Sequence, residues 1–264
     1  GYAVRYVNIA DVEKVVIYGR SGVEWLQVAN SISTPASLET YSFKDISLSS
    51  NGNRVVFSKH NKNIVYDLDQ SVYPQVWTKT GEITVDALCI QMSGDGNRIV
   101  MGDSSGLIHV YEYSNGVWGE ERTISHGFAG DYETVSIDIS KGGEYIIAGY
   151  KATTAIILFR MLTVYTTIDG QKRGETISLQ SSPFLVGHKV SISSDGTKLL
   201  TTKTTSSIMT FAYYEYYSGS ASWIEHGPNV FSGVVTNLLN LSLSGNGNEL
   251  LLLYADRFIT KTPA

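Results

Sequence analysis

Between two apolar segments the chain reads Ser193-Ser194-Asp195-Gly196-Thr197-Lys198-Leu199-Leu200. Asp-Gly tolerates the positive φ angles of a tight turn at low steric cost, so this stretch predicts a reversal between two strands. The same form, S-x-[DNG]-G-x-x, occurs five times in all, with its glycines at Gly52, Gly96, Gly143, Gly196 and Gly247. The spacings between them are 44, 47, 53 and 51 residues. Such a period is typical of repeat architectures.

The segments on either side of each turn have the patterns of strands. Before the turn, apolar residues alternate with other residues, as Ile46 and Leu48 do. After it the residues are continuously apolar, as in 55–57 and 250–253, which predicts that both faces of the second strand are covered. A third strand follows, for which the pattern favours residues 63–68, 107–113, 155–159 and 208–213. A more polar fourth strand often carries Trp.

Four strands per repeat, with the most apolar ones inside, predict an all-β fold, a β-propeller of four-stranded antiparallel blades. A two-sheet sandwich would cover one face of each strand and leave the continuous apolar pattern unexplained. Five turns give five blades, and a degenerate repeat before residue 40 gives a sixth, with five or seven blades as alternatives. We expect residues 1–264 to form one propeller domain with turns near residues 11, 51, 95, 142, 195 and 246. Pairing of the two terminal segments would close the ring.

The composition excludes several classes of protein. With 264 residues, 42% hydrophobic and 17% charged, the chain is apolar enough to fold. A net charge of -5 disfavours nucleic acid, and no segment approaches the roughly 18 apolar residues of a membrane-spanning helix. The single cysteine, Cys89, excludes an intramolecular disulfide. It favours an intracellular assembly or a virion over secretion but leaves the localisation open.

The motifs resemble those of a known family. The segment 193–200 resembles the S-x-D-G-x-x-[LIV]-[LIV] turn of WD40-type propellers, and Ile64-Val65-Tyr66-Asp67-Leu68 is similar to their third strand, with Tyr in place of Trp. The likeness covers nearly the whole chain, although no repeat has a full Trp-Asp pair, so it indicates a divergent WD40-like protein. It implies that Asp67 makes a structural hydrogen bond that locks a turn. The S-x-[DN]-G-N form also resembles repeat proteins of algae, marine microbes and large DNA viruses.

Motifs for catalysis or metal binding are missing from the sequence. None of the five histidines forms an H-x-x-x-H or H-x-H pair, and the chain contains neither a G-x-S-x-G elbow nor a D-x-D-x-D-G calcium loop. We therefore assign no catalytic, cofactor-binding or metal-ligating residue and expect no enzyme. A propeller hydrolase would still be conceivable if acidic side chains converged on the axis.

The densest unusual segment is rich in tyrosine, a residue favoured both in outer strands and in recognition surfaces. Partner contact is one interpretation and aromatic cover over a blade edge is the other, and the residues concerned are Tyr213, Tyr214, Tyr216, Tyr217 and Trp223. The long segments 163–185 and 213–230 are candidate contact loops on the rim. Asn240 begins an N-glycosylation sequence, but its place on an inner strand predicts burial.

A strong scaffold signal without a reaction centre predicts a non-catalytic platform for contacts with other proteins within a larger assembly, which includes a virus particle among its possible forms. A glycan-binding, lectin-like propeller is the alternative, and a propeller glycoside hydrolase is a third hypothesis.

Overall fold

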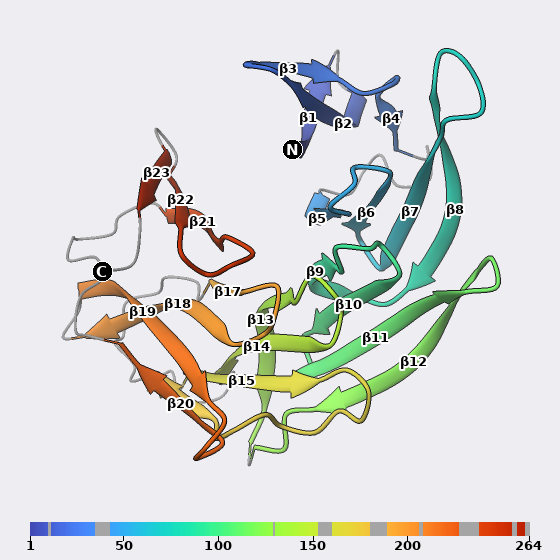
Figure 1. The fold of residues 1–264 in the computed structure, drawn as a ribbon. Coiled ribbons are helices and arrows are strands. Elements are labelled where there is room, and N and C mark those ends of the chain that lie inside the picture. The colour runs from blue at the N-terminus through green and yellow to red at the C-terminus, as the bar shows by residue number, and fades with distance from the viewer. Residues whose placement is uncertain are drawn as a thin grey trace.

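The computed structural model describes residues 1–9, 12–34, 43–128, 130–152, 160–179, 189–205, 208–226, 238–254 and 258–261. In these ranges the chain forms six antiparallel sheets, numbered here in chain order (Figure 1). Sheets 1 to 5 have four strands each, and sheet 6 has three. The all-β fold and its four-stranded antiparallel sheets are therefore as predicted.

The first three sheets contain twelve strands. Sheet 1 consists of β1 (Tyr2–Ile9), β2 (Val12–Ser21), β3 (Glu24–Gln27) and β4 (Ile32–Ser33), of which β3 and β4 both pair with β2. Sheet 2 consists of β5 (Phe43–Leu48), β6 (Arg54–Lys59), β7 (Lys62–Asp69) and β8 (Val76–Thr84). Sheet 3 consists of β9 (Ala87–Met92), β10 (Arg98–Asp103), β11 (Leu107–Ser114) and β12 (Val117–Ser125).

The last three sheets contain eleven strands. Sheet 4 consists of β13 (Tyr132–Ile139), β14 (Tyr145–Ala152), β15 (Arg160–Thr166) and β16 (Ile177–Leu179). Sheet 5 consists of β17 (Val190–Ile192), β18 (Lys198–Thr205), β19 (Ile208–Tyr217) and β20 (Ser222–Glu225). Sheet 6 consists of β21 (Leu238–Leu243), β22 (Leu250–Tyr254) and β23 (Phe258–Lys261).

Consecutive sheets pack side by side around a common centre. The first strands touch in sequence, β1 with β5, β5 with β9, β9 with β13, β13 with β17 and β17 with β21. Figure 1 shows β5, β9, β13 and β17 near the middle, with the later strands of each sheet farther out. This radial order is the arrangement of propeller blades.

One sequence prediction about rim loops was wrong, and one predicted strand lies outside the described residues. The third strand of sheet 4 is β15, because residues 160–166 pair with β14, whereas the predicted segment 155–159 lies outside the described residues. The expected rim loops at 163–185 and 213–230 contain strands, namely parts of β15 and β19 together with β16 and β20. The third-strand prediction 208–213 already covered part of β19, whereas the mixed polarity of β15 hid that strand from a periodicity argument.

The five recurring turns share one hydrogen-bond pattern. Each glycine has a positive φ, between 67° and 82°, and donates its N–H to the carbonyl of the motif serine. The hydroxyl of that serine accepts the N–H five residues later at 2.9–3.0 Å, for example from Lys198 to Ser193 Oγ. The serine is therefore required because it satisfies a backbone donor that a tight turn leaves unpaired. The sixth predicted turn, near residue 11, lies outside the described residues.

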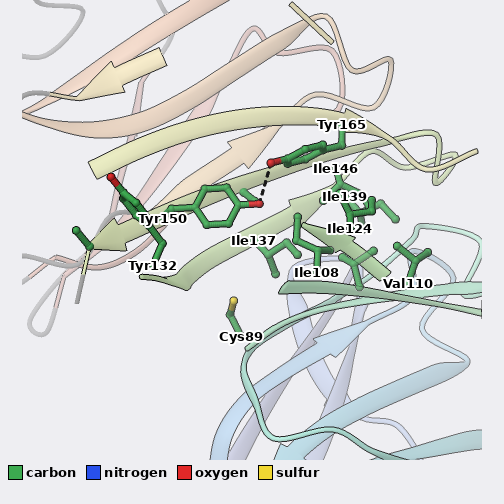
Figure 2. Packing of buried hydrophobic residues seen from close by; sticks show 13 residues of the cluster. Cys89, Ile108, Val110, Ile124, Tyr132, Ile137, Ile139, Ile146, Tyr150 and Tyr165 are labelled. Atoms are coloured by element: carbon green, nitrogen blue, oxygen red, sulfur yellow. Dashed lines mark hydrogen bonds between the residues drawn. The ribbon is translucent and has the colours of Figure 1, made fainter. Parts of the chain in front are cut away.

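The largest apolar cluster lies between sheets 3 and 4 (Figure 2). Ile108 and Val110 of β11 pack with Ile137 and Ile139 of β13, and all are buried. The Tyr150 hydroxyl donates to the Tyr165 hydroxyl at 3.1 Å. Each buried phenol therefore has the other as its hydrogen-bond partner.

Cys89 lies in this cluster, and burial raises the pKa of its thiol. Because the thiolate is the reactive form, we expect Cys89 to resist thiol reagents in the folded protein. A disulfide-exchange reagent at pH 8 should modify less than about a tenth of it per hour and should modify all of it in urea. Rapid native modification, followed by mass spectrometry, would contradict this burial.

The terminal sheets remain separate. Sheet 1 contains β1 and sheet 6 contains β23, and no strand of one pairs with a strand of the other among the described residues. Figure 1 shows them standing apart, with the ring open between them. The predicted pairing of the terminal segments is therefore wrong for this part of the chain, because each terminal strand completes its own local sheet.

Candidate functional site

An axial cavity of about 220 Å³ lies where the first strands converge, and its walls come from five sheets. Its polar lining side chains are Lys44, Asp45, Gln91, Ser136, Asp138, Lys189, Ser191, Asn240 and Ser242. The lining follows from strand alternation, since the apolar residues of each first strand pack between sheets and the residues between them face the axis. Acidic side chains therefore do converge here, which sequence reasoning had left open.

The Asp138 carboxylate joins two sheets. Its Oδ1 accepts the N–H of Ile139, and its Oδ2 accepts both the N–H of Ile192 and the hydroxyl of Ser191, all at 2.9 Å. Burial raises the pKa of Asp138 to about 6, although these three donors oppose the shift. The carboxylate therefore acts as a connector between sheets 4 and 5.

Asp45 repeats this arrangement between sheets 2 and 3. Its Oδ1 accepts the N–H of Ile46 and its Oδ2 accepts the N–H of Ile90, both at 2.9 Å. Burial raises the pKa of Asp45, whereas the backbone donors and the positive charge of Lys189 lower it.

Serines make the same kind of bond at neighbouring positions. Ser47 Oγ accepts the N–H of Met92 at 3.0 Å, and Ser191 Oγ accepts that of Leu243 at 3.0 Å. Ser136 Oγ accepts the N–H of Val190 at 3.2 Å. The axial polar side chains thus bind the backbone of the following sheet, which satisfies donors that the antiparallel ladders leave unpaired.

Asp138 should make stability depend on pH. A carboxyl whose pKa rises from about 3.9 unfolded to about 6 folded binds its proton more tightly in the folded state. Its contribution to the free energy of unfolding is therefore full below about pH 4 and is lost as the pH rises through 6. In urea titrations, the stability of the native protein relative to Asp138→Asn should fall by about 2 kcal/mol between about pH 4.5 and 7.5. A difference that is constant with pH would contradict this assignment.

The tyrosine-rich segment forms the second half of β19, and Trp223 lies in β20. Two of its predicted partner contacts need correction. Tyr213 and Tyr214 are buried, because they pack in the clusters on the two faces of sheet 5, so neither is accessible to a partner. Tyr216 and Trp223 are half-buried and lie together with ring centroids 5.2 Å apart. Tyr217 is 60% exposed and is free of this packing.

Arg173 explains why Tyr216 and Trp223 are arranged in this way. Its guanidinium lies 3.9 Å from the ring centroid of Tyr145 and 4.2 Å from that of Tyr216, and it donates to the carbonyl of Gly196 at 2.6 Å. Trp223 Nε1 donates to the carbonyl of Arg173 at 2.8 Å. These aromatic residues therefore hold sheets 4 and 5 together.

Asp67 forms an ion pair. Arg54 Nε and Nη2 donate to its two carboxylate oxygens at 2.5 and 2.6 Å, while Arg54 Nη1 donates to the carbonyl of Gly96 at 2.8 Å. The Arg54 guanidinium also lies 4.0 Å from the ring centroid of Tyr113. The resemblance implied that Asp67 makes a structural hydrogen bond that locks a turn. In the structure its carboxylate binds a cation that reaches the next sheet.

The cation two residues after the turn glycine is a repeated feature that sequence reasoning missed. Arg98 reaches the Gly143 carbonyl at 3.4 Å, and Lys198 reaches the Asn246 carbonyl at 3.4 Å, just as Arg54 reaches Gly96. Tyr145 occupies this position in sheet 4, where Arg173 supplies the cation instead. The sequence signal for this repeated cation was the basic sixth residue of the motif, S-x-[DNG]-G-x-[RK].

Two kinds of feature are absent from the described part of the chain. No group of three or more His, Cys, Asp or Glu side chains there is arranged to hold a metal ion. No helix in that part has the length and apolar character required to cross a bilayer.

Comparison with known proteins supports the architecture. No family model matches the chain, and no curated protein matches it. The hydrazine synthase of Kuenenia stuttgartiensis is similar in structure, with a TM-score of 0.63, 15% identity, and coverage of 95% of this chain and 70% of that chain. This likeness shows the fold alone. With 1010 solved chains matching, the architecture is too widespread to indicate an activity.

Proposed function

We propose that the chain is a non-catalytic, WD40-like propeller that serves as a platform for contacts with other proteins in a larger assembly. The supporting observation is the use of the axial polar groups. Asp45 and Asp138 lie where a propeller hydrolase would carry its acids, but both carboxylates accept backbone N–H groups that connect adjacent sheets. Their carboxyl oxygens are committed to hydrogen bonds that hold the scaffold together.

The outer surface of sheet 1 offers a contact region. Val23 is 90% exposed and Leu26 is 54% exposed, and Trp25 between them is also exposed. A groove of about 370 Å³ beside Leu26 is lined by Tyr2 together with amide side chains that include Gln27 and Gln70. Aromatic and aliphatic groups beside amide donors and acceptors suit a polypeptide partner.

The assembly that best fits the repeat likeness is an intracellular complex or a virus particle, because similar S-x-[DN]-G-N repeats occur in proteins of algae and large DNA viruses. A lectin-like role has less support, since Tyr213 and Tyr214 are buried.

Affinity purification from the native source tests the platform. We expect a defined set of proteins to co-purify, to lose at least tenfold in yield with the double variant Trp25→Asp/Leu26→Asp, and to bind again when purified components are mixed. Val117→Asp is the matched control, since Val117 is exposed on β12 of sheet 3.

Two results would overturn the proposal. One is saturable binding on a glycan array that disappears in Tyr217→Ala. The other is turnover of a glycoside by the purified protein that disappears in Asp138→Asn.

A further inference from the structure

The chain contains three Asn-Gly pairs, at Asn51-Gly52, Asn115-Gly116 and Asn246-Gly247. The asparagine of such a pair can lose its side-chain amide by a reaction within the chain, because glycine has no Cβ to hinder the approach of its nitrogen to the asparagine Cγ. Both reacting groups must first be free of other bonds. Their hydrogen bonds differ among the three pairs, and the difference sets one pair apart.

The first pair lies in a recurring turn that holds both reacting groups. The N–H of Gly52 donates to the Ser49 carbonyl at 3.0 Å, so the nitrogen is committed to the turn. Asn51 Oδ1 accepts the Ser49 hydroxyl at 2.7 Å and the N–H of Asn53 at 3.0 Å. Gly52 is also buried, and a Cβ there would overlap the Tyr2 ring. A reaction at Asn51 therefore has to break these bonds before a bond to Cγ can form.

The third pair repeats this arrangement. The N–H of Gly247 donates to the Ser244 carbonyl at 2.8 Å. Asn246 Oδ1 accepts the Ser244 hydroxyl at 2.8 Å and the N–H of Asn248 at 3.0 Å. Gly247 is buried as well. The motif serine therefore protects Asn246 in the same way as it protects Asn51.

Asn115 lies in a different kind of turn. Ser114 pairs with Val117 in the hairpin between β11 and β12, so Asn115 and Gly116 alone form its loop, which projects at the right of Figure 1. Their φ angles of 53° and 83° are those of a type I′ turn. Neither the Asn115 side chain nor the Gly116 N–H has a hydrogen-bond partner among the described residues, and both residues are exposed. Asn115 can therefore rotate towards the Gly116 nitrogen without breaking a bond to a neighbour.

Exposure without a following glycine has a different outcome. Asn240 is exposed, so its predicted burial was wrong. The next residue is Leu241, whose side chain is buried and whose N–H donates to Asn240 Oδ1 at 3.0 Å. Packing fixes this backbone, and the leucine side chain screens the nitrogen. Asn240 is therefore not expected to react as Asn115 does.

We propose that Asn115 is a site of spontaneous deamidation, with water as the only co-reactant. The Gly116 nitrogen bonds to the Asn115 Cγ, its proton passes to the side-chain nitrogen, and that nitrogen leaves as ammonia. The product is a cyclic imide. Water then breaks one of the two carbon–nitrogen bonds of the imide, which gives aspartate when the bond to Cγ breaks and isoaspartate when the bond to the main-chain carbonyl breaks. This modification goes beyond the proposed function and lies on a different sheet from its contact region.

Isoaspartate should weaken a contact between sheets. It routes the main chain through the side chain, which lengthens a two-residue loop whose geometry matches the twist of its strands. The pair next to Ser114 and Val117 is Tyr113 with Trp118, and the Tyr113 ring centroid lies 4.0 Å from the Arg54 guanidinium of sheet 2. In urea denaturation, aged protein should therefore have a lower midpoint than fresh protein. A midpoint that ageing leaves unchanged would overturn this part of the proposal.

Incubation of the purified protein in mildly alkaline buffer, followed by peptide mass spectrometry, tests the reaction itself. In the native protein we expect deamidation at Asn115 to be at least about tenfold faster than at Asn51 or Asn246, since the recurring turns must first break hydrogen bonds. In denaturing urea the three pairs should react at similar rates, because only the shared Asn-Gly sequence remains. Methylation by an isoaspartate methyltransferase identifies the isoaspartate product.

A glycine variant tests the role of the attacking nitrogen. Gly116→Ala places a Cβ beside that nitrogen and should slow the loss at Asn115 by at least about tenfold. The matched control is Gly119→Ala on β12, where an added Cβ also meets no atom within 4 Å, and it should leave the rate unchanged.

Equal rates at the three pairs in the native protein would overturn the proposal, as would a rate at Asn115 that Gly116→Ala leaves unchanged. Neither result bears on the partner loss expected from Trp25→Asp/Leu26→Asp, so this proposal and the proposed function fail separately.

Discussion

Replacement of Arg54 by Met should lower the free energy of unfolding by about 3 kcal/mol, measured by urea denaturation. Arg54 is mostly buried and donates two hydrogen bonds to Asp67 at 2.5 and 2.6 Å. Its removal leaves the Asp67 carboxylate unpaired, and it also removes the bond to the Gly96 carbonyl and the contact with the Tyr113 ring. The loss is large because one side chain pairs with Asp67 in its own sheet and also binds the Gly96 carbonyl and the Tyr113 ring of sheet 3.

The control for Arg54 is Lys79→Met. Lys79 pairs with Glu82 at 2.6 Å on the exposed strand β8 and contacts no neighbouring sheet through that pair. Exposed pairs contribute less than about 1 kcal/mol. Equal losses for the two variants would mean that the inter-sheet position of Arg54 has no energetic effect. A double-mutant cycle with Asp67→Asn should give a coupling of about 2 kcal/mol.

Replacement of Gly196 by Ala should also lower the free energy of unfolding by about 3 kcal/mol. Gly196 has φ +67°, which costs an L-residue about 1–2 kcal/mol. An alanine Cβ there would overlap the Tyr145 ring. That ring is held by the Arg173 guanidinium, which is itself bound to the Gly196 carbonyl. Moving the ring to relieve the overlap therefore costs a further free energy of about 1–2 kcal/mol.

The control for Gly196 is Gly116→Ala in the hairpin between β11 and β12. Gly116 has φ +83°, and an added Cβ would meet no atom within 4 Å. We expect a loss of about 1 kcal/mol from backbone conformation alone. Urea denaturation of both variants separates the two costs, and equal losses would exclude the steric contribution of Tyr145.

The sequence was a good guide wherever the cause of structure is local. The five S-x-[DNG]-G-x-x segments form turns because a serine hydroxyl and a glycine with positive φ satisfy the backbone within six residues. The strands before the turns follow from alternation of apolar residues, because successive side chains of an extended backbone point to opposite faces. Strand β15 was not predicted because the polar and apolar residues of Arg160–Thr166 follow neither strict alternation nor a continuous apolar run.

Contacts between repeats could not be read in the same way. Tyr213 and Tyr214 have the composition of a recognition surface, yet both are buried because they lie on opposite faces of the central region of sheet 5. The cation at the Gly196 carbonyl comes from Arg173, outside the motif that supplies it in sheets 2 and 3. The position of a residue in the repeat specifies where its side chain lies on its own sheet. Which residue that side chain contacts depends on the neighbouring sheet.

By itself, the sequence determined the all-β class, the repeated hairpins and the apolar character of the inner strands, because these depend on residues adjacent along the chain. Tertiary structure alone decided that Asp45 and Asp138 bind the backbone of the adjacent sheet near the axis, and that Leu251 and Leu253 remain exposed while their counterparts in sheets 2 to 5 are buried. The physical reason is that burial and hydrogen bonding between sheets depend on which surfaces meet in space, and identical local patterns can face a neighbour or water.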